Sequence, residues 1–154
     1  MNNKKYISLF FIVLLSVLSN IAFSQNNFAI PFFRNYKSLD YNQESQNYSS
    51  VINPKTGIVY FANSSGILEF DNSNWDFIET ANTPVIAFNS NGELFYCCAN
   101  EFGKVNVLTH SAVKLIQFNN VELSNIFIIN NKIFLVSDDS LYKVFLKDDK
   151  YTCK

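Results

Sequence analysis

The residues that could carry acid–base or nucleophilic chemistry are few and widely separated in this sequence. One histidine is present, His110, and it stands between two segments rich in Val, Leu and Ile. No Gly-x-Ser-x-Gly elbow, His-Glu-x-x-His pair, P-loop or Gly-x-Gly-x-x-Gly loop occurs. Glu69 with Asp71, Asp138-Asp139 and Asp148-Asp149 have the spacing of solvated strand-edge or turn acids. We therefore expect no enzyme activity, no catalytic residue and no cofactor.

Three cysteines, Cys97, Cys98 and Cys153, are the other reactive side chains. Neighbouring residues of a strand point to opposite faces, so a bridge between Cys97 and Cys98 would need unusual geometry. We interpret these two as small hydrophobic residues of a strand. One histidine and the absence of a Cys-x-x-Cys pair predict that there is no metal site.

Ligand binding has more candidates than catalysis. Aromatic rings on loops suit sugars and other extended ligands. The candidate ligand-binding residues are Arg34, Tyr36, Tyr41 and Trp75. Arg34, the sole arginine, either anchors a ligand carboxylate or pairs with Asp40. The alternative for the aromatic residues is a packing role, in which Tyr48, Tyr60 and Trp75 fill the space between neighbouring sheets.

The elements that must position these residues are short β-strands. Runs rich in Val, Ile, Phe and Tyr recur after residue 25, and Asn, Ser, Asp or Gly bounds each run. The predicted strands are 57–63, 66–70, 75–78, 84–88, 93–98, 104–108, 112–116, 126–129, 132–136 and 141–145, and residues 147–154 are predicted as a turn followed by the start of another strand. Asn91-Gly92 and Asn130-Asn131 suit the positive φ of tight hairpin turns. An all-β chain of antiparallel hairpins is expected.

The turns recur at a regular spacing. The first turn of each unit is assigned to Gly57, Gly92 and Asn131, and the second to Gly66, Gly103 and Ser140. Units of about 40 residues with four short strands are typical of β-propeller blades, whereas a β-sandwich with regular turns is the alternative. We expect about three blades of an incomplete propeller, at residues 45–80, 81–118 and 119–154.

The N-terminus has the pattern of an export signal. Lys4 and Lys5 precede a nearly continuous apolar run at 7–18, and Ala22-Phe23-Ser24 supplies a small-x-small cleavage pattern. We predict a signal peptide helix at 1–24 and a periplasmic or secreted protein with no membrane span after residue 24. The alternative is an uncleaved membrane anchor.

The composition limits the partners. Hydrophobic residues are 48% and aromatic residues 16% of the sequence, which excludes a disordered chain. Twelve Lys and Arg against thirteen Asp and Glu leave a net charge of −1. No basic surface is available for phosphates, so we expect no nucleic acid partner.

Several segments between Ile30 and Val105 carry a family resemblance. They are Pro31-Phe-Phe-Arg-Asn-Tyr36, Asp40-Tyr41, Gln46-Asn47-Tyr48, 57–63, 66–71 with Trp75, and Glu101-Phe-Gly103. In order and spacing this region resembles the first blades of the two-component regulator propeller family, the periplasmic sensor domains of regulators found mainly in Bacteroidetes. The chain departs from that pattern at Asp71-Asn72, where Asp-Gly is usual, and at Cys97-Cys98, where small residues are usual.

The resemblance implies a non-catalytic sensory, ligand-binding propeller piece of a signalling regulator that responds to glycans. The alternatives are a secreted β-rich adhesion or scaffolding protein and, because 71–75 loosely matches a sugar-hydrolase repeat, a fragment of a propeller hydrolase or lyase. Propellers close with about four to eight blades. We therefore expect the chain to be the front part of a larger propeller, with the missing blades or a second copy of itself as partner, besides a glycan or other small ligand.

Overall fold

The computed structural model describes residues 6–7, 34–147 and 150–154. The elements with described bounds are a short helix, α2 (Ser38–Tyr41), and twelve strands. The strands are β1 (Asn47–Ile52), β2 (Val59–Asn63), β3 (Gly66–Phe70), β4 (Trp75–Glu79), β5 (Val85–Phe88), β6 (Leu94–Cys98), β7 (Glu101–Asn106), β8 (Ser111–Gln117), β9 (Leu123–Ile129), β10 (Lys132–Ser137), β11 (Leu141–Lys147) and β12 (Lys150–Cys153).

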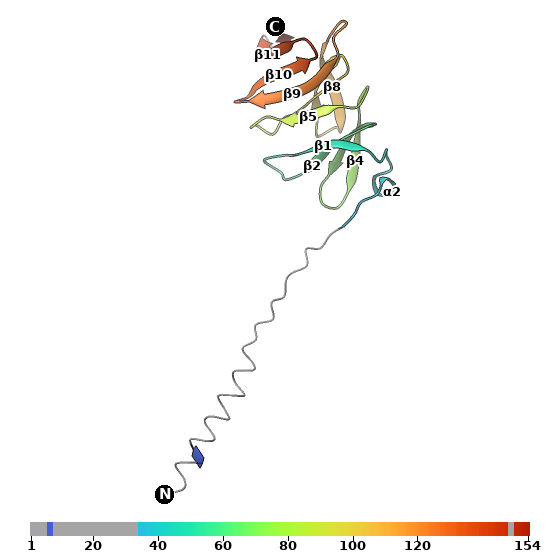
Figure 1. Cartoon of the computed structure of the whole chain (residues 1–154), viewed down its shortest axis with the longest axis vertical. Helices are drawn as coiled ribbons and strands as arrows, with labels where there is room; N and C mark the ends of the chain where they lie inside the picture. The colour runs from blue at the N-terminus through green and yellow to red at the C-terminus, as the bar shows by residue number, and fades with distance from the viewer. Residues whose placement is uncertain (1–5, 8–33, 148–149) are drawn as a thin grey trace. The chain divides into compact units, whose positions relative to one another are not determined.

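The strands form three four-stranded antiparallel sheets in chain order. Sheet I holds β1 to β4, sheet II holds β5 to β8 and sheet III holds β9 to β12, and each strand pairs with the next one along the chain. The predicted all-β fold of four-stranded, blade-like sheets is confirmed (Figure 1). The predicted signal peptide, residues 1–24, lies outside the described residues apart from Tyr6 and Ile7.

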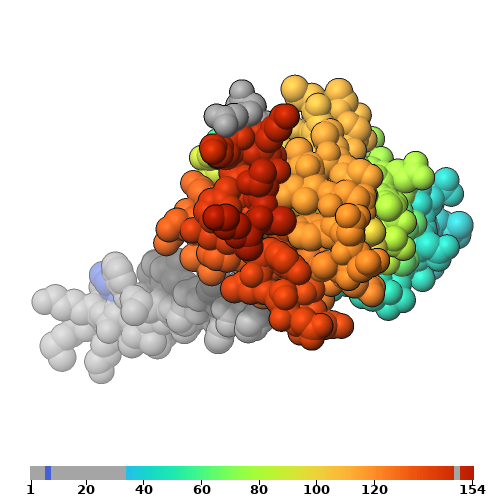
Figure 2. All heavy atoms as spheres, turned by 90° about the horizontal axis from the view of Figure 1, so that it is seen from above, coloured from blue at the N-terminus to red at the C-terminus, as the bar shows by residue number. Residues whose placement is uncertain are grey.

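The chain divides into two compact units, Met1–Asn35 and Tyr36–Lys154. All three sheets belong to the second unit. Within this unit the sheets follow one another in chain order, as the colours from cyan through green and orange to red show in Figure 2.

The first turn of each sheet matches the predicted repeat. Gly57, Gly92 and Asn131 all have positive φ, at 74°, 76° and 59°. Asn53 and Asn89 close the first two turns in the same way, because the side-chain oxygen of each accepts backbone N–H groups two and three or four residues further on.

The second predicted turn is wrong in sheet II. Gly103 lies inside β7, and the turn that precedes this strand contains Ala99 with φ of 46°. Gly103 is needed for packing instead, because a Cβ there would lie 2.4 Å from the ring of Tyr96, its cross-strand partner. The strands β1 and β12 complete sheets I and III at residues where no full strand was predicted.

Two apolar cores hold the sheets together. Leu94, Tyr96 and Cys98 of β6 join the core shared with sheet I. Phe95 and Cys97 of the same strand join the core shared with sheet III. Every residue of β6 is buried, because alternate side chains of this strand pack against a different neighbouring sheet. Sheet II is therefore the packed centre of the unit.

Candidate functional site

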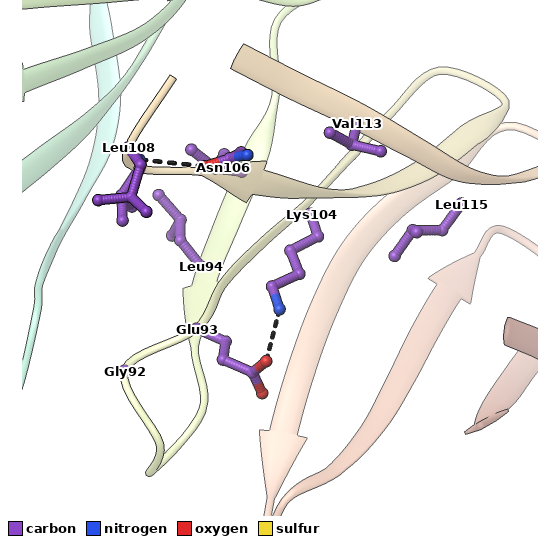
Figure 3. A pocket seen from close by; sticks show the side chains of 10 residues that line it. Gly92, Glu93, Leu94, Lys104, Asn106, Leu108, Val113 and Leu115 are labelled. Carbon is purple, nitrogen blue, oxygen red and sulfur yellow. Dashed lines mark hydrogen bonds and ion pairs between the residues drawn. The ribbon is translucent and has the colours of Figure 1, made fainter. Parts of the chain in front are cut away.

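An open pocket lies on sheet II (Figure 3). Its volume is about 430 Å³, which is within the range of small-ligand sites. The lining residues are Gly92, Glu93, Leu94, Lys104, Val105, Asn106, Val107, Leu108, Val113 and Leu115. Apolar side chains form most of this wall, and one ion pair supplies its charge.

The ion pair joins Lys104 Nζ and Glu93 Oε1 at 2.5 Å. Glu93 Oε2 also accepts a hydrogen bond of 2.6 Å from the Asn89 side-chain amide. The hydrogen bond from Lys104, followed by that from Asn89, lowers the pKa of Glu93 below its ordinary value. Glu93 is therefore a carboxylate at neutral pH, and both charged groups of the pair are half-exposed toward the pocket.

Local backbone geometry positions this pair. The turn closed by Asn89 and Gly92 delivers Glu93 to the start of β6. Phe95 of β6 and Lys104 of β7 are cross-strand partners, so the lysine side chain returns along the sheet toward the turn. Neither Glu93 nor Lys104 could be selected from the sequence, because their pairing depends on strand register.

Three of the four predicted ligand-binding residues come together at a second place. Tyr36, Tyr41 and Trp75 join Phe61 and Phe70 in an aromatic cluster on the face of sheet I that points away from sheet II. Ring centroids of Trp75 lie 4.5 Å from Phe70, 5.1 Å from Tyr41, 5.3 Å from Tyr36 and 5.6 Å from Phe61. The Trp75 ring is half-buried and contacts four other rings, which is packing rather than an open stacking platform.

The remaining predicted ligand-binding residue is Arg34. Arg34 is exposed and belongs to the first compact unit, whereas the three aromatic residues belong to the second. Among the described residues, the indole N–H of Trp75 is buried and has no hydrogen-bond acceptor. A hydrogen-bond acceptor on a ligand could satisfy this N–H group.

The packing role predicted for three aromatic residues holds for one of them. Tyr60 is buried in the core between sheets I and II. Trp75 packs on the opposite face of sheet I, and Tyr48 is 58% exposed on β1. Residue type alone could not distinguish these three environments.

The paired cysteines are buried and point into different cores. Cys97 joins the core toward sheet III and Cys98 the core toward sheet I, and both are free thiols. Burial raises the pKa of Cys97 to about 12 and that of Cys98 to about 11. Neither thiol supplies a nucleophile at neutral pH.

No family model matches the sequence, and no curated protein matches it. A solved structure does: the extracellular domain of a putative one component system from B. thetaiotaomicron, with TM-score 0.64 and 13% sequence identity. The likeness shows a shared fold. It covers 79% of this chain and 18% of that chain, so this chain spans less than a fifth of its neighbour's length.

Within 6–7, 34–147 and 150–154, no helix has the length and apolar character needed to cross a membrane.

Proposed function

We propose that this chain is part of the ligand-binding sensor propeller of a regulator of the two-component regulator propeller family, acting in the periplasm after export. The observation that carries the proposal is the fold that its three sheets share with the extracellular domain of a putative one component system. The order and spacing of the segments between Ile30 and Val105 support the same family.

The outer face of sheet III supports a larger assembly. Its apolar side chains are solvent-exposed in the described structure: Phe127 by 48%, Ile129 by 59%, Leu141 by 64% and Phe145 by 39%. Apolar patches of this kind are typical of interaction surfaces. In this proposal a further blade, or a second copy of the chain, covers them.

The ligand in this proposal is a glycan or one of its breakdown products, and the sheet II pocket is its first candidate site. The apolar wall would contact the faces of sugar rings. The Glu93–Lys104 pair would exchange hydrogen bonds with hydroxyl groups at the rim. Two charged groups that already pair with one another suit recognition better than turnover.

Calorimetric titration of the chain from residue 25 with a panel of oligosaccharides tests this function. We expect saturable binding of at least one oligosaccharide and no change in its reducing ends. Lys104→Met should weaken the binding by about tenfold, since each lost hydrogen bond to a charged group contributes about 1.5 kcal/mol. Lys114→Met, which removes an exposed lysine outside the pocket, is the matched control and should bind like the parent chain.

Two results would overturn the proposal. Release of new reducing ends would indicate a propeller hydrolase. Absence of binding across the panel, combined with unchanged transcript profiles on every polysaccharide in a strain that lacks the gene, would favour an adhesion or scaffolding protein.

A further inference from the structure

Three ligand-type side chains meet where sheet I contacts a turn of sheet II. Glu69 of β3 and Asp76 of β4 are cross-strand partners and therefore share one face of sheet I. His110 ends the turn between β7 and β8 of sheet II. One ligand atom from each of these residues lies within 4.8 Å of the others. The site brings His110 to two carboxylates that precede it by more than thirty positions in the chain.

Glu69 is the unusual member of this group. The residue is 7% exposed, and its Oε2 atom is buried without a hydrogen-bond donor among the described residues. The imidazole Nδ1 of His110 lies 3.5 Å from that oxygen. A buried carboxylate oxygen without a partner is costly, and a bound cation would remove this cost.

Neighbouring residues fix the positions of His110 and Glu69. The side-chain oxygen of Asn106 accepts backbone hydrogen bonds from Leu108 and Thr109 and so fixes the turn before His110. Buried Tyr60 of β2 is the cross-strand partner of Glu69 and packs beside it on the same face of sheet I. The His110 side chain is 41% exposed, so an ion can reach the site from solvent.

We propose that Glu69, Asp76 and His110 bind one divalent transition-metal ion of the zinc class, which joins sheet I to sheet II. One imidazole with two carboxylates is a donor set that Zn²⁺ accepts, whereas Ca²⁺ and Mg²⁺ prefer oxygen ligands alone. Three protein ligands leave a position for water. The inference goes beyond the sensor function, because the site is separate from the sheet II pocket and requires no glycan.

Titration of the metal-stripped chain from residue 25 with ZnCl₂ tests the proposal by calorimetry and by imidazole NMR. His110 is the sole histidine, so one set of imidazole signals reports on the site. We expect one Zn²⁺ per chain, a shift of those signals, and a midpoint of thermal unfolding that rises by several degrees with Zn²⁺. Millimolar Mg²⁺ should not compete.

Two variants and two controls identify the ligands. His110→Asn keeps a residue type that tolerates the positive φ of 46° at this position, and Glu69→Gln keeps the side-chain shape. Each should weaken Zn²⁺ binding at least tenfold, as the loss of a direct ligand requires. Asp138→Asn, in an exposed turn, should bind Zn²⁺ like the parent chain, and Cys153→Ser tests for capture of the ion by the partly exposed thiol.

Unshifted imidazole signals at saturating Zn²⁺ would overturn the proposal, as would equal affinity in the parent chain and in His110→Asn. Because His110 is exposed, its replacement leaves the fold intact even if Glu69→Gln does not fold. Loss of Zn²⁺ binding in Cys153→Ser alone would assign the ion to the thiol and also contradict the proposal.

Discussion

Sheets I and III each have one face that does not pack against sheet II, and the two faces differ. On sheet I this face carries Trp75 with Phe61 and Phe70, and Tyr36 and Tyr41 from the chain before β1 pack on it. On sheet III the corresponding face carries side chains that are 39 to 64% exposed: Phe127, Ile129, Leu141 and Phe145. We call them the covered face and the open face.

The two faces differ in how much of each the chain itself covers. Terminal units of repeat proteins need a cover for the surface that an internal unit buries against its neighbour. The segment from Tyr36 to Tyr41, including α2, provides part of such a cover on sheet I. On sheet III the described residues provide no such cover. The Nζ of Lys143 lies over the Phe145 ring, 4.9 Å from its centroid. Rings from the chain itself therefore pack on the covered face, whereas the apolar side chains of the open face stay exposed among the described residues.

The largest expected effect comes from deleting the ring at the centre of the covered face. Trp75→Ala should destabilise the chain by about 3 kcal/mol, because it removes contacts with four rings at once. Phe127→Ala on the open face should change the free energy of unfolding by less than about 0.5 kcal/mol. Urea unfolding followed by circular dichroism measures both, and equal losses would contradict the distinction between the two faces.

A smaller effect is expected where the backbone approaches the covered face. A Cβ on Gly66 would lie 2.6 Å from the Ile78 carbonyl oxygen and 2.8 Å from the Phe77 ring. Gly66→Ala should therefore cost about 2 kcal/mol through overpacking. A Cβ on Gly57 would meet no atom within 4 Å. Gly57→Ala should therefore lower the free energy of unfolding by about 1 kcal/mol, because of the positive φ alone. Equal urea midpoints for Gly66→Ala and Gly57→Ala would show that close packing at Gly66 adds nothing to the cost.

Tyr41 tests the cover itself. Its ring centroid lies 5.1 Å from that of Trp75, so Tyr41→Ala should cost about 1 kcal/mol and open the indole to water. Because Trp75 is the sole tryptophan, its fluorescence reports this change without interference. We expect a red-shifted emission and stronger quenching by acrylamide. An unchanged spectrum would mean that Tyr41 does not cover the ring.

The smallest effect concerns sheet II, which both terminal sheets share. The pKa of Glu93 is lowered in the folded chain, so its contribution to stability is present above the ordinary glutamate pKa of 4.5 and is lost as the pH falls through the folded value. The side chain is 36% exposed, and solvent screening keeps this contribution below about 1 kcal/mol. Glu93→Gln should show a flatter loss of stability on acidification than the parent chain. Parallel stability–pH profiles for the parent chain and Glu93→Gln would exclude the Glu93–Lys104 ion pair as a contributor to stability.

Short runs of strand-forming residues, each bounded by turn residues, predicted much of this fold. The runs of Val, Ile, Phe and Tyr and the turns at Gly57 and Gly92 indicated four-stranded antiparallel units correctly. The turn assigned to Gly103 was wrong because glycine serves close packing as well as turns, and only the register of β6 with β7 shows which.

The candidate sites were harder to predict for a related reason. The tryptophan and tyrosine residues of the covered face could be selected by type, but their mutual packing could not. Glu69 and His110 are distant in the sequence, so their approach depends on how sheet I meets a turn of sheet II. Contacts between sheets have no local pattern in the sequence, whereas hairpins do.

We propose above all that the open face of sheet III is an interaction surface, which a second copy of the chain covers when the chain is isolated. Sedimentation velocity of the chain from residue 25, over a range of micromolar concentrations, tests it most directly. The account predicts reversible association that Phe127→Ser with Phe145→Ser abolishes, while the matched change Tyr48→Ser on β1 leaves it intact. A chain that stays monomeric at every concentration and unfolds in one sharp thermal transition would contradict the claim.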